Sequence, residues 1–440
     1  MPPNHADLRI DPEWIVPVEP ANAVLYRQSL LVRDGRIAAI VPRDLADDWE
    51  CGEHLVLPGH CLIPGLVNLH THAAMTLLRG YADDLPLMTW LHDHIWPAEA
   101  RHMSADFVRD GSRIACAEML EGGVTCFNDM YFFPEATLEA AVETGLRIAC
   151  GLIVADFPSA YAGDADAYLQ QGLALRDAWR DHPLVRFTLA PHAPYSVGDR
   201  SLEKVVTYAE QLDLPVHMHI HETEDEIRQG LEKYGLRPLA RLNNLGLLTP
   251  GLTAVHAVHL TPGEIELLAG HGCHVAHCPA SNLKLASGFA PVAGLLAAGV
   301  NTGLGTDGAA SNNRLDLMGE MRLAALLAKG VSGNAAALPA HQALAMATLA
   351  GARALGMGDE IGSLTVGKQA DLAAVDLTSP AHQPCYDPVS HLVYSAGREE
   401  VRHVWVAGRQ VVRDGRALQV DHARLAAQAQ GWRERIGHHS

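Results

Sequence analysis

The sequence predicts an α/β fold: a (β/α)8 barrel of the TIM type, with a small flanking β-sandwich domain built from both ends of the chain. Short apolar runs alternate about eight times with amphipathic stretches, and eight strand–helix units close such a barrel. Both chain ends instead alternate with a period of two, which is typical of strands in a separate sheet. At 440 residues the chain is long enough for a barrel with a satellite domain. An open doubly wound sheet is the competing arrangement.

The apolar runs expected to form the barrel strands are spread through the middle of the chain. They are Leu66–His72, Val124–Met130, Leu146–Val154, Arg186–His192, Pro215–His221, Leu252–Val258, Cys273–Cys278 and Asn301–Thr306. The stretches between them, for example "SADFVRDGSRIACAEMLEGG", open with Ser, Thr or Asp and close with Gly, the residues that favour the two ends of a helix. Strands and helices are therefore expected to alternate.

The two ends of the chain carry the signals of β-hairpins. Asp34-Gly35 and Asp414-Gly415 are turn signals, each set between alternating apolar and polar residues. We expect the ends to pair with each other in one small domain. The predicted division is residues 1–60 for the N-terminal part of the β-sandwich, 61–362 for the barrel, and 363–440 for the C-terminal part with a terminal helix.

The composition argues against several classes of partner. Lys and Arg number 33 against 51 Asp and Glu, and the net charge of −18 disfavours binding to nucleic acid. No stretch is apolar enough to span a bilayer, and the first residues lack the pattern of a secretory signal, so a cytoplasmic location without membrane contact is expected. The eight cysteines include no CxxC pair, which suits a reducing compartment.

Two histidines stand where the first apolar run ends, in "PGLVNLHTH". Side chains alternate along a strand, so His70 and His72 point the same way, as metal ligands do. The alternative is that one imidazole belongs to the core and the other is solvated. Other strands carry similar residues: His192 ends the fourth, His256 lies on the sixth and Asp307 follows the eighth. Because the carboxyl ends of barrel strands meet at one mouth, these side chains are expected to cluster.

The fifth strand contributes "HMHIHE", with His217, His219 and His221 predicted on one face, and spacing alone does not choose among them. Three imidazoles and one carboxylate suit zinc, and a coordination position left open for water makes such a site catalytic. Glu222 lies just beyond the strand, within reach of a substrate above the metal. The alternative for Glu222 is an acid in the first turn of a helix, since "ETEDEI" places carboxylates where the helix dipole favours them.

Three other sites that short motifs suggest are rejected: a dinucleotide site, a phosphate loop and a zinc site of the cytidine-deaminase type. "GLGTDG" fits a dinucleotide-binding pattern but lies at the last strand. "GSLTVGKQ" resembles a phosphate loop, yet Gln369 stands where Ser or Thr binds the metal. The PCxxC element of the cytidine-deaminase type of zinc site is absent from the sequence.

Five motifs occur in order along the chain: "PGLVNLHTH", "HMHIHETEDE", "AVHAVHL", "GLGTDGAASNN" and "GKQADL". As a set they resemble the amidohydrolase superfamily. Four more, "AAMTLLRGYADDLPLMTWL", "WPAE", "DMYFFP" and "APHAPYSVGD", narrow the resemblance to the 5′-methylthioadenosine/S-adenosylhomocysteine deaminases, some of which are called s-triazine chlorohydrolases. The similarity covers nearly the whole chain.

This resemblance implies one divalent metal ion per subunit, expected to be Zn2+, and it assigns roles to individual residues. The implied metal ligands are His70, His72, His219 and Asp307. The implied catalytic residues are Glu222, His256 and Asp307. The implied substrate-binding residues are His192 beside the purine, Glu99 at the ribose hydroxyls, Glu222 and Trp90. For Glu99 the alternative is a first-turn helix acid, and a homodimer is expected from the family alone.

The implied reaction is the hydrolytic deamination of adenosine-type nucleosides. It converts 5′-methylthioadenosine to the inosine analogue and ammonia. S-adenosylhomocysteine and adenosine are further candidate substrates of the same reaction. Zinc lowers the pKa of its water to about 7, while Asp307 accepts a proton, Glu222 donates one to ring N1 and His256 orients the attacking oxygen. The alternatives are an s-triazine or N-ethylammeline chlorohydrolase, a nucleobase deaminase on the same site, and a non-catalytic metal-storage or scaffold protein.

One segment departs from the family's pattern. Relatives that accept S-adenosylhomocysteine have arginines after the third strand that pair with the carboxylate of its tail. Here the region reads "RIACGLIVADFPSAYAGDADAY", in which Arg147 comes too early and acids stand where arginine is expected. Since a desolvated carboxylate needs a charged partner, we expect a preference for the uncharged methylthio tail.

Overall fold

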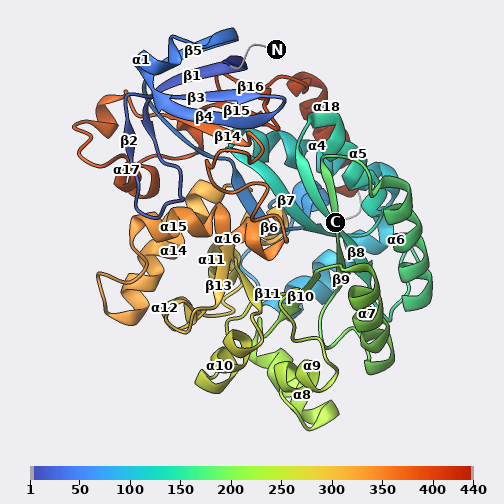
Figure 1. Cartoon of the computed structure of the whole chain (residues 1–440). Coiled ribbons are helices and arrows are strands. Elements are labelled where there is room, and N and C mark those ends of the chain that lie inside the picture. The colour runs from blue at the N-terminus through green and yellow to red at the C-terminus, as the bar shows by residue number, and fades with distance from the viewer. Residues whose placement is uncertain (1–3, 438–440) are drawn as a thin grey trace.

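The computed structural model describes residues 4–437, in which a parallel barrel packs against a mixed sheet (Figure 1). The barrel strands are hydrogen-bonded to one another in chain order, which excludes the doubly wound alternative. They are β6 (Leu66–Thr71), β7 (Val124–Met130), β8 (Arg147–Val154), β9 (Val185–Pro191), β10 (Val216–Ile220), β11 (Leu252–His256), β12 (His274–His277) and β13 (Asn301–Leu304). All eight predicted strands are present, each within two residues of its predicted bounds.

Asn68 on β6 and Thr306, just past β13, close the barrel. The Thr306 and Asp307 N–H groups donate to the His70 carbonyl oxygen at 3.1 and 3.0 Å. The buried Asn68 amide accepts from the Thr306 N–H at 3.0 Å and donates to the Thr306 hydroxyl at 2.8 Å. These bonds join the first and last strands and bring their carboxyl ends side by side.

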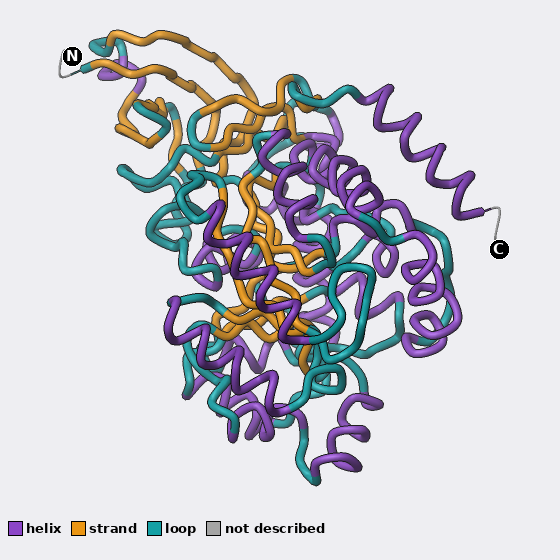
Figure 2. Tube along the Cα trace, turned by 90° about the vertical axis from the view of Figure 1, so that its right-hand side faces the viewer, coloured by secondary structure: helices purple, strands orange, loops and turns teal. Residues whose placement is uncertain are grey.

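Helices cover the outside of the barrel, as Figure 2 shows in purple around the orange strands. Polar caps begin several of them: the Ser104 hydroxyl accepts from the Phe107 N–H at 3.2 Å, and Thr261 and Glu264 form a capping box. The helices are α4 (Ala105–Glu121), α5 (Pro134–Thr144), α6 (Ala165–Trp179), α7 (Asp199–Leu212), α8 (Glu224–Tyr234), α9 (Pro238–Asn244), α10 (Pro262–Gly270), α11 (Pro279–Lys284), α12 (Val292–Ala297), α13 (Ala309–Asn312), α14 (Leu317–Ser332), α15 (Ala340–Met346) and α16 (Leu349–Ala354).

The connection from β6 to α4 is a long segment of short helical turns. It contains η1 (Ala73–Leu78), α2 (Leu87–Thr89), η2 (Trp90–Ile95) and α3 (Trp96–His102). The last helix, α18 (His422–Gly437), packs on α4: the Trp432 ring meets Phe107 edge to face at 5.3 Å, and its N–H donates to Asp110. Trp432 belongs to the same apolar cluster as Trp90 and Tyr131, so the C-terminal helix supports this connection.

The mixed sheet combines strands from both ends of the chain, as predicted. Its strands are β1 (His5–Ile15), β2 (Leu25–Tyr26), β3 (Gln28–Arg33), β4 (Arg36–Pro42), β5 (Glu50–Pro64), β14 (Leu372–Asp376), β15 (Val401–Val406), β16 (Arg409–Arg413) and β17 (Arg416–Ala417). Antiparallel pairing of β5 with β14 joins the two halves. Short helices α1 (Arg43–Ala46), η3 (Pro380–His382), α17 (Pro388–Tyr394) and η4 (Arg398–Glu400) flank the sheet.

Both predicted hairpin turns are present. Asp34 and Gly35 join β3 to β4 with φ of 51° and 72°, and Asp414 and Gly415 join β16 to β17 with φ of 52° and 77°. Positive φ at two successive residues is the geometry that a tight hairpin requires. β5 runs unbroken through residue 60, and the division of the chain at residues 60 and 362 stays a prediction.

A buried ion pair links the barrel to the mixed sheet. Arg147 at the start of β8 donates to both oxygens of Asp371, at 3.1 and 3.0 Å, and the two side chains are 0% and 1% exposed. Asp371 also accepts from the Ala407 N–H at 2.7 Å, and Arg147 donates to the Gln369 side chain at 2.8 Å. The "GKQADL" motif therefore fixes the sheet against the barrel.

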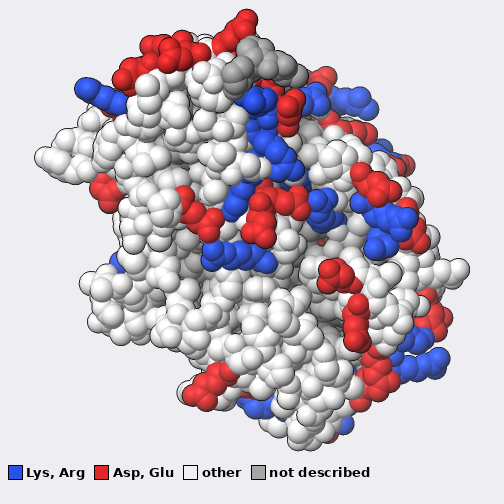
Figure 3. Space-filling view, viewed as in Figure 1, with Lys and Arg blue, Asp and Glu red and all other residues white. Residues whose placement is uncertain are grey.

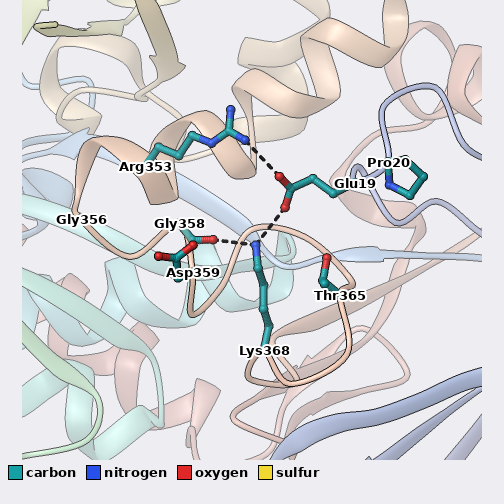
Figure 4. Close-up of a pocket in the computed structure, with 8 residues that line it drawn as sticks. All are labelled: Glu19, Pro20, Arg353, Gly356, Gly358, Asp359, Thr365 and Lys368. Carbon is teal, nitrogen blue, oxygen red and sulfur yellow. Dashed lines mark hydrogen bonds and ion pairs between the residues drawn. The ribbon is translucent and has the colours of Figure 1, made fainter.

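Glu19 makes a second connection, between Lys368 and Arg353 (Figure 4). The Lys368 ammonium donates to Glu19 at 3.0 Å, and to the Gly358 carbonyl and the Ser363 hydroxyl at 2.6 Å each. Arg353 donates to the other Glu19 oxygen at 3.0 Å. An ammonium group has three donors, so no donor of Lys368 is left for a phosphate, and "GSLTVGKQ" is a structural turn.

Charged side chains of both signs are intermixed over the upper and right-hand parts of the face seen in Figure 3. The lower left part of that face carries few charges. Among residues 4–437, no helix has both the length and the apolar character that crossing a bilayer requires.

The Arg147→Met substitution is expected to lower the free energy of unfolding by about 3–5 kcal/mol, because it leaves Asp371 buried without its charged partner. Denaturant unfolding followed by circular dichroism measures the loss. Arg314→Met is the matched control: it breaks an exposed pair with Glu399 at 3.2 Å and is expected to cost less than about 1 kcal/mol. Equal losses in the two variants would contradict the assigned importance of the buried pair.

Candidate active site

A cluster of imidazoles and one carboxylate lies at the carboxyl ends of the barrel strands. His70 is the penultimate residue of β6, His72 directly follows that strand, His219 lies on β10 and Asp307 follows β13. One ring nitrogen from each of His70, His72 and His219 lies within 4.8 Å of the others. Asp307 Oδ1 lies 3.2 Å from Nε2 of both His70 and His72. The structure thus brings together the four side chains expected to hold a metal ion.

Hydrogen bonds behind the rings set their orientation. His72 Nδ1 donates to the Met130 carbonyl at 2.5 Å, and His219 Nδ1 donates to the His192 carbonyl at 2.7 Å. Because a carbonyl only accepts, the proton of each neutral ring is on Nδ1 and the lone pair is on Nε2. The buried Nε2 of His70 has no well-aligned hydrogen-bond partner among residues 4–437. These lone pairs are suited to metal coordination.

The three histidines around the fifth strand have different surroundings, which spacing alone did not reveal. His219 belongs to the cluster. His217 lies behind it, with Nε2 at 2.9 Å from His70 Nδ1. His221 does not share their face, because β10 ends at Ile220 and His221 has a φ of 58°; its Nε2 accepts from the Leu239 N–H at 3.1 Å. The expectation of three imidazoles on one face is wrong for His221.

The two oxygens of Asp307 have separate partners. Oδ2 accepts from the hydroxyls of Ser281 at 2.6 Å and Ser311 at 2.7 Å. Oδ1 accepts from the Gly308 N–H at 2.8 Å and faces the histidines. Burial alone would raise the pKa of Asp307, but His70 and His72 lower it well below its usual range, so the carboxylate is ionised. Neither serine was predicted, because each comes from a short helix after a strand.

Glu222 and His256 lie next to each other beside the cluster. Glu222 Oε2 is 3.9 Å from His256 Nε2, and the His256 ring stacks on that of His219 at 5.5 Å. Burial raises the pKa of Glu222, which favours a protonated carboxyl. His256, His70 and Asp307 form a second group whose ligand atoms lie within 4.8 Å of one another.

The structure decides against a helix-dipole role for Glu222. Helix α8 begins at Glu224, after the N-cap residue Thr223, so Glu222 lies before the helix. The acid that serves the helix start is Glu226, whose carboxylate accepts from the N–H groups of His221 at 2.8 Å and Glu222 at 2.9 Å. The Glu222 carboxyl therefore does not serve the start of the helix, and it lines the cavity instead.

A cavity of 780 Å³ opens beside the cluster. Trp90, Glu99 and His192, the predicted residues not yet described, all line it. Trp90 donates its N–H to the Ala82 carbonyl at 3.0 Å, which leaves apolar ring surface toward the cavity. His192 Nδ1 lies 2.8 Å from the Ser196 hydroxyl. Trp90 and His192 share the lining with Glu99, Glu222 and His256, so the predicted substrate and proton-handling residues meet in one space.

Glu99 is held by a residue that the sequence did not single out. The Tyr131 hydroxyl donates to Glu99 Oε1 at 2.5 Å, and burial raises the pKa of Glu99 to about 7. Glu99 lies in the first turn of α3, as the alternative of a first-turn helix acid predicts. Its side chain also lines the cavity, so the two interpretations of Glu99 are compatible. Tyr131 comes from "DMYFFP", directly after β7, and its place at a strand end was the available signal.

The rest of the cavity wall is mainly apolar, with a few hydroxyl-bearing residues among those that line it. Leu91, Met103, Phe132, Ile153 and Phe157 line it. Among the described residues that line the cavity there is no Lys or Arg. The wall therefore suits an uncharged ring system with an apolar substituent.

A family model described as "Amidohydrolase family" matches residues 61–411. The chain belongs to this family. It is 49% identical over 432 residues, 98% of each chain, to a protein of Teredinibacter turnerae named 5-methylthioadenosine/S-adenosylhomocysteine deaminase. It is 44% identical to a protein of Saccharophagus degradans with the same name, over 98% of this chain and 97% of that one. The family resemblance predicted from the motifs is confirmed.

Solved structures of amidohydrolases share the whole architecture. An adenosine deaminase from Xanthomonas campestris with bound zinc has a TM-score of 0.97 at 49% identity, covering 99% of each chain. An atrazine chlorohydrolase from Arthrobacter aurescens complexed with zinc has a TM-score of 0.91 at 26% identity, covering 97% of this chain and 99% of that one. Two neighbours of this amidohydrolase thus contain zinc, which the donor set described above also suits.

The Asp307→Ala substitution is expected to reduce the zinc content of the purified protein, since it removes the carboxylate oxygen that faces His70 and His72. Glu222→Gln is expected to keep stoichiometric zinc, because Glu222 lies outside both ligand groups. Elemental analysis after gel filtration measures both variants. Full zinc retention by Asp307→Ala would exclude the carboxylate from the ligand set.

Proposed function

We propose that the protein is a metal-dependent aminohydrolase that converts 5′-methylthioadenosine and related adenosine nucleosides to the inosine analogue and ammonia. The observation that carries the proposal is that the ligand cluster, Glu222 and Glu99 border one cavity of 780 Å³. The names of the full-length relatives and of the zinc-containing adenosine deaminase support the same activity.

One Zn2+ per subunit is the metal that the donor set fits best. Three imidazoles and one carboxylate match its preferences, and the unpartnered Nε2 of His70 fits a ligand. We assign His70, His72, His219 and Asp307 as the residues that hold it. When bound, zinc lowers the pKa of a water molecule to about 7.

Asp307 and Glu222 transfer the protons in the proposed reaction. The ionised Asp307 accepts a proton from the attacking water as its oxygen adds to C6 of the purine. Burial raises the pKa of Glu222, which favours its role as the donor of a proton to ring N1, where that proton neutralises the charge that develops. Such acid–base assistance contributes about 10²–10⁴-fold. Asp307 then gives its proton to the amino group at C6, the C6–N bond breaks, and ammonia leaves. The C6 hydroxyl gives its proton back to Glu222, which forms the C6 carbonyl of the inosine product and restores both carboxyl groups.

Three residues position the nucleoside. Glu99 accepts from the ribose hydroxyls, His192 contacts the purine, and Trp90 offers an apolar surface. The hydrogen bond from Tyr131 keeps the Glu99 carboxyl turned into the cavity. A site built in this way favours ribosylated substrates over free bases and triazines.

The segment after β8 supports a preference for uncharged 5′ substituents. Phe157, Pro158, Ser159 and Ala160 all line the cavity, and they come from the region where relatives that bind S-adenosylhomocysteine carry arginine. A desolvated carboxylate has no cationic partner among these residues, so binding the homocysteine tail is costly. We therefore propose 5′-methylthioadenosine as the preferred substrate.

The chlorohydrolase alternative has a specific observation in its favour, the TM-score of 0.91 with a zinc-containing atrazine chlorohydrolase. The identity to that protein is 26%, against 49% to the adenosine deaminase structure. Glu99 has no evident use in binding a triazine, and this favours the nucleoside. The open cavity beside the cluster argues against metal storage. A homodimer and a cytoplasmic location stay predictions.

A substrate screen tests the proposal directly. The zinc-loaded protein is expected to release ammonia from 5′-methylthioadenosine with a kcat/KM at least about 10-fold above that for S-adenosylhomocysteine, the ratio that one missing charge-assisted hydrogen bond produces. Adenosine and chlorinated triazines complete the panel. Turnover of a triazine with no nucleoside deamination would overturn the proposed function.

Ala160 offers a gain-of-function test of the tail preference, because it is exposed at the edge of the cavity. Ala160→Arg is expected to raise kcat/KM for S-adenosylhomocysteine by about 10-fold relative to 5′-methylthioadenosine. Ala160→Gln, of similar length and without charge, is the matched control. Equal kcat/KM for both substrates in the wild type would show that the tail argument is wrong.

The Glu99→Ala substitution is expected to lower kcat/KM for nucleosides by about 10–100-fold, since charge-assisted hydrogen bonds to the ribose are lost. Turnover of free adenine is expected to change little. Tyr131→Phe keeps the Glu99 carboxyl and is expected to have a smaller effect on nucleosides. Parallel losses for nucleoside and base would show that Glu99 does not recognise the ribose.

A further inference from the structure

His256 leaves its strand in a strained backbone conformation. It is the last residue of β11, and φ is 70° at His256 and 50° at Ala257. Since both residues are in the left-handed region, the regular alternation of a strand does not determine where the imidazole points. The side chain is 1% exposed, so its neighbours must fix the ring and decide which nitrogen carries the proton.

Asn282 is the side chain that contacts the inner nitrogen of this ring. Its Oδ1 lies 2.8 Å from His256 Nδ1, and the residue is 2% exposed. The Asn282 backbone is held on both sides: its N–H donates to the Cys278 carbonyl at 3.0 Å, and its carbonyl accepts from the Ser287 N–H at 2.8 Å. These bonds fix the backbone from which the Asn282 side chain extends, and within residues 4–437 its only side-chain hydrogen bond is the one to His256.

Helix α11, which carries Asn282, is itself anchored to the site. The neighbouring Ser281 hydroxyl donates to Asp307 Oδ2 at 2.6 Å. The Ala280 N–H donates to the buried Glu320 carboxylate at 3.0 Å. Two successive side chains of one short helix thus contact the two residues, Asp307 and His256, that border the reacting centre.

We infer that Asn282 is a positioning residue that holds His256 in the tautomer protonated at Nδ1. An amide oxygen only accepts, so the hydrogen between the two side chains belongs to Nδ1. A neutral imidazole then has its lone pair on Nε2, the nitrogen that lies 3.9 Å from Glu222 Oε2 on the side of the cavity. This inference rests on the proposed deamination, for which it defines the part played by His256.

The lone pair makes His256 a hydrogen-bond acceptor at the reacting centre. Its Nε2 accepts from the attacking water or from the protonated Glu222 carboxyl, and so orients the O–H that takes part in the reaction. Loss of Asn282 lets the ring adopt the other tautomer, in which an N–H replaces the lone pair. Because this orientation matters only as the oxygen adds to the purine, the effect is expected in kcat and not in KM.

Asn282→Leu removes the acceptor while keeping the volume of the side chain. Its kcat for 5′-methylthioadenosine is expected to fall by about 10–100-fold with KM and zinc content unchanged, the size typical of an outer partner of a histidine in a metal site. Asn282→Asp keeps an acceptor oxygen in the same place and is expected to regain most of the loss. A wild-type kcat in Asn282→Leu, or no recovery in Asn282→Asp, would overturn the inference.

A second asparagine–histidine pair in the barrel provides the matched control. Asn301 Nδ2 lies 3.0 Å from His274 Nδ1, where β12 and β13 begin, at the end of the barrel away from the cluster. Asn301→Leu is expected to leave kcat at the wild-type value. Asn301 and His274 are half-buried. A loss equal to that of Asn282→Leu would mean that breaking any asparagine–histidine pair in the barrel has this effect, and would overturn the inference.

Nitrogen-15 spectra of histidine-labelled protein give a readout that is independent of activity. The His256 signals, identified by their absence in His256→Gln, are expected to show a protonated Nδ1 and an unprotonated Nε2 in the wild type, and the other tautomer in Asn282→Leu. A protonated Nε2 in the wild type overturns the inference even if Asn282→Leu does not fold. Failure of the wild type to deaminate nucleosides would refute the proposed function, and the spectra would still decide the tautomer.

Discussion

Closure of the barrel between β6 and β13 is the constraint on which the site depends. The backbone of His70 accepts from Thr306 and Asp307, while its ring lies beside the Asp307 carboxylate. The Asn68 side chain bonds to Thr306 across a separation of 238 residues, so the ligands meet only once the chain has folded completely. A metal ion that binds this cluster therefore stabilises the closed barrel, and metal binding and folding are coupled.

Hydrogen bonds from outside the cluster orient three of its four side chains, His72, His219 and Asp307. Carbonyl groups of Met130 and His192 fix the tautomers of His72 and His219, and two serine hydroxyls occupy the far oxygen of Asp307. Met130 ends β7 and His192 directly follows β9, while the two serines lie in the short helices α11 and α13 that follow β12 and β13. Buried polar groups that are satisfied in this way cost little and leave only the metal-facing atoms unpartnered.

The barrel and the position of the cluster could be read from the sequence, because both follow from local regularities. Apolar runs define strands, and the carboxyl ends of parallel strands meet, so His70, His72 and Asp307 were placed at one mouth from their positions alone. His221 was misplaced because its positive φ breaks the alternation that the prediction assumes. Tyr131 lies in a loop directly after β7, and Ser281 and Asn282 lie in the short helix α11. They escaped prediction because the position of such short segments depends on tertiary packing.

The strand ends and the connecting segments also differ in function: the strand ends carry the residues of the reaction, and the segments contact the rest of the substrate. The strand ends and the segments directly after them supply the cluster, and an atrazine chlorohydrolase complexed with zinc has the same fold at 26% identity. Trp90 and Glu99, on the turns before α4, and the residues from Phe157 to Ala160, after β8, form the far wall of the cavity. The Tyr131 hydroxyl donates to Glu99 and so links this wall to the end of β7. Substrate preference can therefore change through these segments while the geometry at the metal, set by barrel closure, stays the same.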